Sequence, residues 1–221
     1  MPSCNGWQVN WPNAINKFMA IINQATKELQ VKIVYYGPGK GGKTTNLEQV
    51  HSQVQNVQEK GKLVSLATSA DRTLFFDFLP IEAMASKGFK TKFQLYTVPG
   101  QVIYNTTRQL VLRGVDGIVF VADSQYDKMA ENVESFQNLE DNLKTLKLEF
   151  AEIPYVLQFN KRDLPDAAPV EYMEFLLNNR EVRVPSFTSV ASRCEGVFEP
   201  LNMITRLLLN KFINQGGRKS P

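Results

Sequence analysis

The chain has 221 residues, of which 43% are hydrophobic and 21% charged, and its formal net charge at pH 7 is +3. This length and composition suit one globular α/β domain with a modest extension, and the small net charge argues against a nucleic-acid partner. One histidine, His51, and two widely separated cysteines argue against a zinc site and against Ser-His-Asp or Cys-His catalysis.

Residues 1–27 form an N-terminal extension before the first expected core strand. Asn13 is a suitable N-cap, and Ile15, Phe18 and Ile22 follow at helical spacing, which predicts an amphipathic helix. This helix either packs on its own domain or docks on a partner or a membrane. No apolar run reaches the roughly 20 residues that span a bilayer, and we find no myristoylation glycine or prenylation cysteine. We therefore expect a cytoplasmic protein with no direct lipid anchor.

A glycine-rich segment lies between an expected strand and an expected helix. Residues 29–36 form an apolar, β-branched and aromatic run, and apolar residues at helical spacing follow later: Leu47, Val50, Val54 and Val57. Residues 37–44, Gly-Pro-Gly-Lys-Gly-Gly-Lys-Thr, match the P-loop pattern G-x-x-x-x-G-K-[ST]. Here backbone N–H groups and a helix N-terminus would face a phosphate chain, with Lys43 on the β- and γ-phosphates and the Thr44 hydroxyl on Mg²⁺. The candidate phosphate-binding residues are Gly37, Gly39, Lys40, Gly41, Gly42, Lys43, Thr44 and Thr45.

Strands and helices alternate along the rest of the chain. Periodicity predicts strands over residues 63–67, 89–96, 117–123, 153–159 and 184–190, and the alternating strand 89–96 has the pattern of a half-exposed edge strand. Helices are expected around residues 110–112 and over 129–146, 171–178 and 201–212. The alternation predicts one doubly wound, mostly parallel α/β sheet over residues 28–213, with helices on both faces and a flexible basic tail over 214–221. Ligands of such sheets bind at the carboxyl ends of the strands.

Residues 160–163, Asn-Lys-Arg-Asp, follow a buried type of strand and match N-K-x-D, the guanine-recognition signature of GTPases. The Asp163 carboxylate would accept hydrogen bonds from guanine N1–H and the 2-amino group, and adenine lacks this donor pair. The Asn160 side chain would brace the loop and approach the base, while the stem of Lys161 would lie along the ring. A P-loop ATPase or nucleotide kinase is the alternative that Asp163 argues against.

The turn Val98-Pro99-Gly100-Gln101 occupies the place of the D-x-x-G-Q motif of Ras-like proteins. The Gly100 N–H can meet the γ-phosphate, and Gln101 can orient the attacking water. Thr97 stands where that motif has an aspartate that supports Mg²⁺, so Asp77 or water would have to replace the carboxylate.

Four segments together resemble the bacterial MglA family, the Ras-like small GTPases that control cell polarity and gliding motility. They are residues 32–39 (KIVYYGPG), 71–80 (DRTLFFDFLP), 95–101 (LYTVPGQ) and 160–165 (NKRDLP). The Thr-Val-Pro-Gly variant is itself a mark of that family. The resemblance runs from about residue 29 to about residue 212, and it implies a Ras-like G domain that binds GTP or GDP with Mg²⁺.

The resemblance also implies roles for single residues. Arg72 matches an intrinsic arginine finger, which joins Gln101 and Lys43 as a catalytic candidate, and Thr73 matches a threonine that senses Mg²⁺ and the γ-phosphate. The segment that contains Val190 and Ala191 occupies the place of the last guanine-contacting loop, where the Ala191 N–H would suit the base O6.

The partner implied by the family is MglB, a roadblock-type GTPase-activating dimer. Polarity or motility effectors would bind the switch segments 72–79 and 101–108, and partners would recruit the chain to the cell pole or the inner membrane face. A nucleotide-loaded scaffold that does not hydrolyse GTP is the alternative kept open by Thr97 and residues 1–27.

Overall fold

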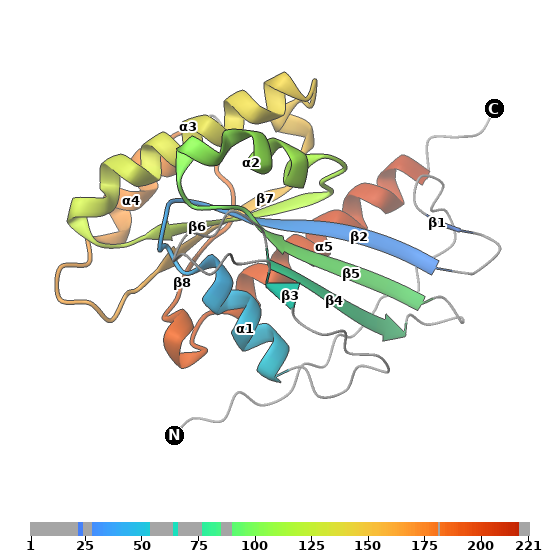
Figure 1. The fold of residues 1–221 in the computed structure, drawn as a ribbon, viewed down its shortest axis with the longest axis horizontal. Coiled ribbons are helices and arrows are strands. Elements are labelled where there is room, and N and C mark those ends of the chain that lie inside the picture. Colours follow the sequence, from blue (N-terminus) through green and yellow to red (C-terminus); the bar gives the residue numbers. More distant parts are fainter. Residues whose placement is uncertain are drawn as a thin grey trace.

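The computed structural model describes residues 22–23, 28–53, 64–65, 77–84, 90–180 and 182–216. A twisted sheet crosses the molecule in the order β3-β4-β5-β2-β6-β7-β8, with β1 paired to β2 (Figure 1). Strands β5, β2, β6, β7 and β8 are mutually parallel, whereas β1, β3 and β4 pair antiparallel with their neighbours. The strand bounds are β1 Ile22–Asn23, β2 Glu28–Tyr36, β3 Val64–Ser65, β4 Asp77–Met84, β5 Lys90–Thr97, β6 Gly117–Asp123, β7 Tyr155–Asn160 and β8 Ser186–Thr188.

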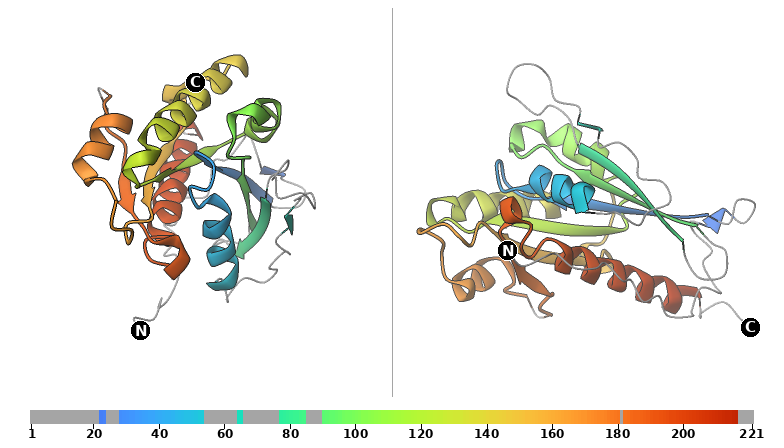
Figure 2. Two further views of the ribbon diagram at one scale, coloured as in Figure 1. Left: turned by 60° about the vertical axis from the view of Figure 1, so that its left-hand side comes forward. Right: turned by 90° about the horizontal axis from the view of Figure 1, so that it is seen from below.

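Helices cover both faces of this sheet (Figures 1 and 2). Helices α1 and α5 pack on one face and α2, α3 and α4 on the other, which confirms the doubly wound, mostly parallel α/β fold. The helix bounds are α1 Lys43–Gln53, α2 Asn105–Leu112, α3 Met129–Thr145, α4 Val170–Leu177 and α5 Phe198–Gly216. Short 3-10 helices are η1 Val102–Tyr104, η2 Tyr126–Lys128, η3 Phe150–Glu152 and η4 Ala191–Arg193. None of the helices in the described ranges has the length and apolar character needed to cross a bilayer.

The strands β6 and β7 are buried along their whole length. Because successive side chains of a strand point to opposite faces, β6 feeds both cores: Val119 and Val121 join the α1 and α5 side, and Ile118 and Phe120 join the α3 side. Strands buried on both faces have nearly continuous apolar sequences. The sheet therefore holds the carboxyl ends of β2, β5, β6 and β7 in a fixed relation.

The strand β5 has the predicted alternation but not the predicted edge position. Phe93 and Leu95 are buried and Gln94 is half-buried, yet β5 lies between β4 and β2. Alternation reports how well each face of a strand is covered, and it carries no information on the place of the strand in the sheet.

The N-terminal prediction is wrong at Ile22. Ile22 and Asn23 form β1, which pairs antiparallel with Leu29 and Glu28. On this side of β2, β6 pairs only with residues 33–36, so β1 covers backbone groups of β2 that β6 does not reach. The sheet thus begins before the predicted boundary at residue 28, and residues 1–21 lie outside the described residues.

The predicted boundary at the other end is also displaced. Helix α5 continues to Gly216, so residues 214–216 belong to the helix and not to the predicted tail. Glycine is a common residue at the C-terminal end of a helix because it adopts the conformations that end one without strain. The remaining residues 217–221 lie outside the described residues.

The packing of α3 on the sheet predicts a stability difference between two of its positions. Leu139 is fully buried between α3 and the strands, whereas Val133 on the same helix is 42% exposed. We expect Leu139→Ala to lower the free energy of unfolding by about 2–5 kcal/mol because it leaves a cavity. Urea unfolding at saturating GDP measures the loss, and Val133→Ala is the control expected to change stability by less than about 0.5 kcal/mol. Equal losses for both variants would contradict the described packing.

Candidate nucleotide-binding site

The P-loop follows β2 and leads directly into α1. Lys43, the first residue of α1, is buried, and its ammonium group donates hydrogen bonds to the carbonyl oxygens of Gly37 (3.0 Å) and Pro38 (2.5 Å). The Lys43 side chain is thus folded back over the P-loop, the segment predicted to bind a phosphate chain. Thr44 and Thr45 are half-buried in the first turn of α1, which contains no acidic side chain. The positive end of the helix dipole at this turn favours an anion.

Two glycines let neighbouring segments touch the P-loop more closely than any side chain would permit. A Cβ atom on Gly42, whose φ is +102°, would lie 2.1 Å from Asn160 Nδ2. A Cβ atom on Gly100 would lie 2.3 Å from the Cα of Gly39. The base-recognition motif and the Val98–Gln101 turn therefore both lie against the P-loop, as the sheet topology predicts.

Asn160 joins three segments that are far apart in the sequence. Its side-chain amide donates to Gly41 O (2.9 Å), and its oxygen accepts from the Ala191 N–H (2.9 Å) and from Ser189 Oγ (3.1 Å). The predicted bracing role of Asn160 is confirmed. The Ala191 N–H, predicted to suit a base O6, donates to Asn160 in this structure, and its contact with a base stays a prediction. Val190 is buried beside it, and its N–H donates to Glu195 O.

The two charged residues of N-K-x-D each have a partner of opposite charge. Asp163 Oδ2 lies 3.3 Å from Nη2 of Arg193. Lys161, whose φ is +66°, places its ammonium nitrogen 2.5 Å from Oδ2 of Asp123, a buried residue at the end of β6. Asp123 therefore fixes the head of Lys161, and Arg193 holds the carboxylate that is predicted to recognise guanine.

The Val98–Gln101 turn brings only part of the predicted catalytic set to the P-loop. Gly100 lies against Gly39, while the side chain of Gln101 is exposed. Thr97, at the end of β5, is 1% exposed, so the place of the usual aspartate is a buried hydroxyl. Arg72 and Thr73 lie outside the described residues.

Metal binding in the described ranges depends on few protein groups. There, no set of three or more His, Cys, Asp or Glu residues is arranged to hold a metal ion. Mg²⁺ typically takes one or two protein ligands and completes its shell with water and substrate phosphates, so the Thr44 hydroxyl fits that requirement. Asp77 is the first residue of β4 and precedes the pair Phe78–Tyr96, which places its backbone near that of Thr97.

Comparison with known proteins agrees with this geometry. Residues 15–207 match the ADP-ribosylation factor family. The chain is 50% identical over 199 residues to the mutual gliding-motility protein MglA of Myxococcus xanthus, which covers 90% of this chain and all of that protein. The chain belongs to the MglA family of Ras-like small GTPases. It is also 27% identical over 149 residues, 67% of its length, to an uncharacterized protein of Methanocaldococcus jannaschii, of which 81% is covered.

The P-loop, the Gly100 turn and the Asn160 loop, which the sequence analysis assigned to one nucleotide site, lie against one another in the fold. The chain is accordingly a GTP-binding switch protein. The family match begins at residue 15, which agrees with the inclusion of β1 in the sheet.

A second polar connection in this MglA-like site escaped the sequence analysis. Gln158, buried in the middle of β7, donates to Asn46 Oδ1 of α1 (2.8 Å) and to Ser189 Oγ (2.9 Å). Asn46 Nδ2 in turn donates to Gly42 O (2.9 Å). With the bonds of Asn160, these contacts close a ring that links the P-loop to residues 188–192, the loop predicted to contact guanine. The sequence does show Gln158 as a polar residue within an otherwise apolar strand, which indicates a buried polar contact. The partners of Gln158 lie too far away in the sequence to be identified from it.

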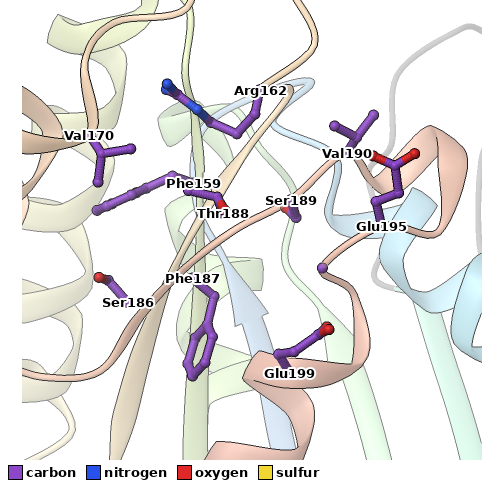
Figure 3. Close-up of a pocket in the computed structure, with 11 residues that line it drawn as sticks. Phe159, Arg162, Val170, Ser186, Phe187, Thr188, Ser189, Val190, Glu195 and Glu199 are labelled. Carbon is purple, nitrogen blue, oxygen red and sulfur yellow. The ribbon is translucent and has the colours of Figure 1, made fainter.

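A pocket of about 590 Å³ lies beside the same loop but is not the nucleotide site (Figure 3). It shares Ser189 and Val190 with the loop, yet it includes no residue of the P-loop and neither Asp163 nor Gly100. It is lined by Phe159, Arg162, Val170, Ser186, Phe187, Thr188, Ser189, Val190, Glu195, Gly196 and Glu199.

The polar ring predicts different effects for a single and a double substitution. Gln158→Leu leaves Asn46 Oδ1 buried without its donor, which costs about 1–3 kcal/mol. Asn46→Leu combined with Gln158→Leu removes both amides, while Gly42 O keeps the backbone N–H of Asn46 (3.0 Å) and Ser189 keeps Asn160. We therefore expect the double variant to be more stable than Gln158→Leu in urea unfolding at saturating GDP.

The double variant should also release GDP faster than the wild type, because its guanine-binding loop has lost the connection to α1. Dissociation of a fluorescent GDP analogue measures the rate. A wild-type rate in the double variant would show that the ring does not hold the loop.

Proposed function

We propose that the chain hydrolyses bound GTP to GDP and phosphate and uses this reaction to end its own active state. The contact between Gly100 and Gly39 is the observation that supports the proposal most directly, because it brings the turn that carries Gln101 against the phosphate-binding loop. Attack by a water molecule on the γ-phosphorus would form the new P–O bond while the bond to the β-phosphate oxygen breaks. Catalysis of phosphoryl transfer depends on positioning and on stabilising the charge of the transition state.

Each residue has one task in this proposal. Lys43 exchanges its hydrogen bonds to Gly37 O and Pro38 O for the β- and γ-phosphates, and Gln101 orients the water. The Gln101 side chain is exposed, and ordering it costs conformational entropy. Intrinsic hydrolysis is therefore expected to be slow.

Thr44 and the family-implied Thr73 would hold Mg²⁺, which would supply positive charge to offset that of the β- and γ-phosphates. Arg72 would act on the same charge as an arginine finger, worth about 10³–10⁵ in rate when correctly placed. These roles of Arg72 and Thr73 rest on the family resemblance.

We propose an MglB-like roadblock dimer as the partner that accelerates hydrolysis. Two apolar side chains close to Gln101 in the sequence support a docking surface on η1 and α2, since Ile103 is 80% and Leu110 52% exposed. Tyr104, the last residue of η1, is half-buried.

The cellular role that we propose is control of polarity or gliding motility, and it rests on the name of the Myxococcus xanthus relative. On the same basis we propose a cytoplasmic chain that partners bring to the cell pole or the inner membrane face. The alternative of a nucleotide-loaded scaffold that does not hydrolyse GTP is supported by the buried Thr97 in place of a carboxylate.

Single-turnover hydrolysis separates the enzyme from the scaffold. The wild-type chain should hydrolyse bound GTP faster than Lys43→Ala, and an MglB-type dimer should accelerate it further. Gln101→Ala should keep its nucleotide affinity and lose at least about tenfold of the accelerated rate, because the attacking water is no longer oriented. Wild-type rates equal to those of Lys43→Ala, with and without the dimer, would favour the scaffold, and an unchanged rate in Gln101→Ala would remove Gln101 from the mechanism.

The role of Asp163 in guanine recognition predicts an exchange of base specificity. In Asp163→Asn the acceptor pair for N1–H and the 2-amino group is lost, while the new amide can donate to the C2 carbonyl of xanthine. We expect GDP affinity to fall at least about 100-fold, as two charge-assisted hydrogen bonds are lost, and xanthosine diphosphate affinity to rise. Equilibrium titration of both nucleotides measures the ratio. Asp166→Asn, an exposed neighbour, is the control, and an unchanged ratio in Asp163→Asn would refute the assignment.

A further inference from the structure

Arg108 is a fully buried cation in the middle of α2, with 0% of its surface exposed. Arginine is almost never fully buried without a charged partner, because removing a charge from water costs several kcal/mol. Every hydrogen bond of the Arg108 guanidinium goes to a neutral oxygen within the described residues. A group this costly requires a reason beyond packing.

Two of these bonds go to consecutive carbonyl groups of the turn before Gln101. Arg108 Nε donates to Pro99 O (2.9 Å) and Nη2 donates to Gly100 O (2.6 Å). A planar guanidinium presents donors in a fixed fork, so it can hold two neighbouring carbonyl groups at once, whereas a lysine ammonium cannot match that geometry. Arg108 thus fixes the orientation of two peptide units of the turn.

The orientation of the carbonyl groups determines where the N–H groups point. In a trans peptide the C=O and N–H bonds point in opposite directions, and the described residues contain no cis peptide. Since Pro99 O faces Arg108, the Gly100 N–H faces away from it. Gly39 of the P-loop lies against Gly100. Arg108 therefore fixes the Gly100 N–H so that it points away from α2, in a turn that lies against the P-loop.

The guanidinium also polarises this peptide. A cation bonded to a carbonyl oxygen makes the N–H of the same peptide unit a stronger donor, by about 10–30% per bond in the condensed phase. Among the described residues, no acidic side chain is bonded to Arg108. Burial raises the pKa of the Tyr36 hydroxyl, although the Arg108 charge acts in the opposite direction, so this phenol stays uncharged. The positive charge of Arg108 is thus available to act through the peptide.

The other side of Arg108 is anchored to α3 and β2. Nη1 donates to Asn138 Oδ1 (2.7 Å) and to the Tyr36 hydroxyl (3.4 Å), and the guanidinium carbon lies 5.0 Å from the centre of the Tyr36 ring. Asn138 Oδ1 also accepts from the Tyr36 hydroxyl (2.7 Å) and from Asn142 (3.1 Å). Because Tyr36 directly precedes Gly37, the P-loop and the turn are both tied to this network.

We propose that Arg108 is a positioning residue for the terminal phosphate of a nucleoside triphosphate. Through the Pro99–Gly100 peptide it orients and strengthens the Gly100 N–H, and it thereby favours GTP over GDP. This inference rests on the proposed place of the γ-phosphate at Gly100. It concerns binding, and it can be tested without hydrolysis.

Equilibrium titration of the full chain with GDP and with guanosine 5′-(β,γ-imido)triphosphate provides the test. Arg108→Lys keeps the charge and loses the fork, and Arg108→Met loses both. We expect an unchanged GDP Kd, within about twofold, and a triphosphate Kd raised about tenfold, the loss of one charge-assisted hydrogen bond. Retained GDP binding reports that each variant is folded. The matched control is Arg113→Met, an exposed arginine just after the end of α2, which should leave both Kd values unchanged.

Three results would overturn the inference. The first is an equal loss of affinity for GDP and for the triphosphate, which would indicate a purely structural role. The second is an unchanged Kd for both nucleotides in the Arg108 variants. The third is a wild-type chain that binds the two nucleotides equally well. If neither Arg108 variant binds GDP, Asn138→Ala decides, since it loosens the anchor of Arg108 without touching the turn. It should shift the triphosphate Kd in the same direction, and an unchanged ratio would reject the proposal. Loss of hydrolysis in single-turnover assays with a retained triphosphate preference would contradict the proposed enzyme activity and leave the role of Arg108 intact.

Discussion

The site depends on backbone segments that touch without side chains between them. Gly100 meets Gly39, and Gly42 leaves room for the amide of Asn160. Any larger residue at Gly42 or Gly100 would separate the P-loop from the loop that reads the base or from the turn that carries Gln101. The parallel sheet makes these contacts possible because it brings the carboxyl ends of β2, β5 and β7 to one edge. The glycines therefore turn a general property of the fold into one continuous ligand site.

Polar groups in the core are concentrated around this site. Asn46, Gln158 and Asn160 form the ring between the P-loop and the base loop, and Arg108 and Asn142 lie in the network behind the Gly100 turn. Buried polar groups cost free energy unless they are bonded, and the Gln158 side-chain oxygen has no partner in the described structure. Local violations of good packing are expected where function requires them. The two networks lie on opposite faces of the sheet, so the loop proposed to bind the base and the turn proposed to meet the terminal phosphate are each supported by a separate polar cluster.

Much of the fold was predictable because the strong signals were local. Buried strands are recognised in a sequence as continuous apolar runs, and the predicted strand over residues 117–123 coincides with β6. The P-loop and N-K-x-D motifs were equally visible, since their residues are adjacent in the chain. Periodicity failed where the environment decided the outcome. Ile22 has the spacing of an amphipathic helix, but it forms a strand that pairs with the part of β2 that β6 does not reach.

Arg108 and Gln158 could not be assigned from the sequence for a related reason. On α2 an arginine between Thr107 and Gln109 reads as a solvent-facing residue, and only the fold places it behind the Gly100 turn. Gln158 meets Asn46 across 112 residues, a separation for which a single sequence holds no signal. Likewise, Arg193 was not recognisable as the partner of Asp163, because η4 and the end of β7 meet only in three dimensions.

Thr97 stands where Ras-like proteins usually have an aspartate, and its burial at the end of β5 makes the two residues differ in desolvation cost. An aspartate buried at the end of β5 would need a cation or several donors to offset its desolvation, whereas a threonine hydroxyl needs only an ordinary hydrogen bond. Arg108, by contrast, is a buried charge that holds the Gly100 turn from α2, and its sign is the one that attracts phosphate. In the proposed site the turn would meet a terminal phosphate through a polarised peptide, while Mg²⁺ would be held by Thr44, the family-implied Thr73, water and the phosphates.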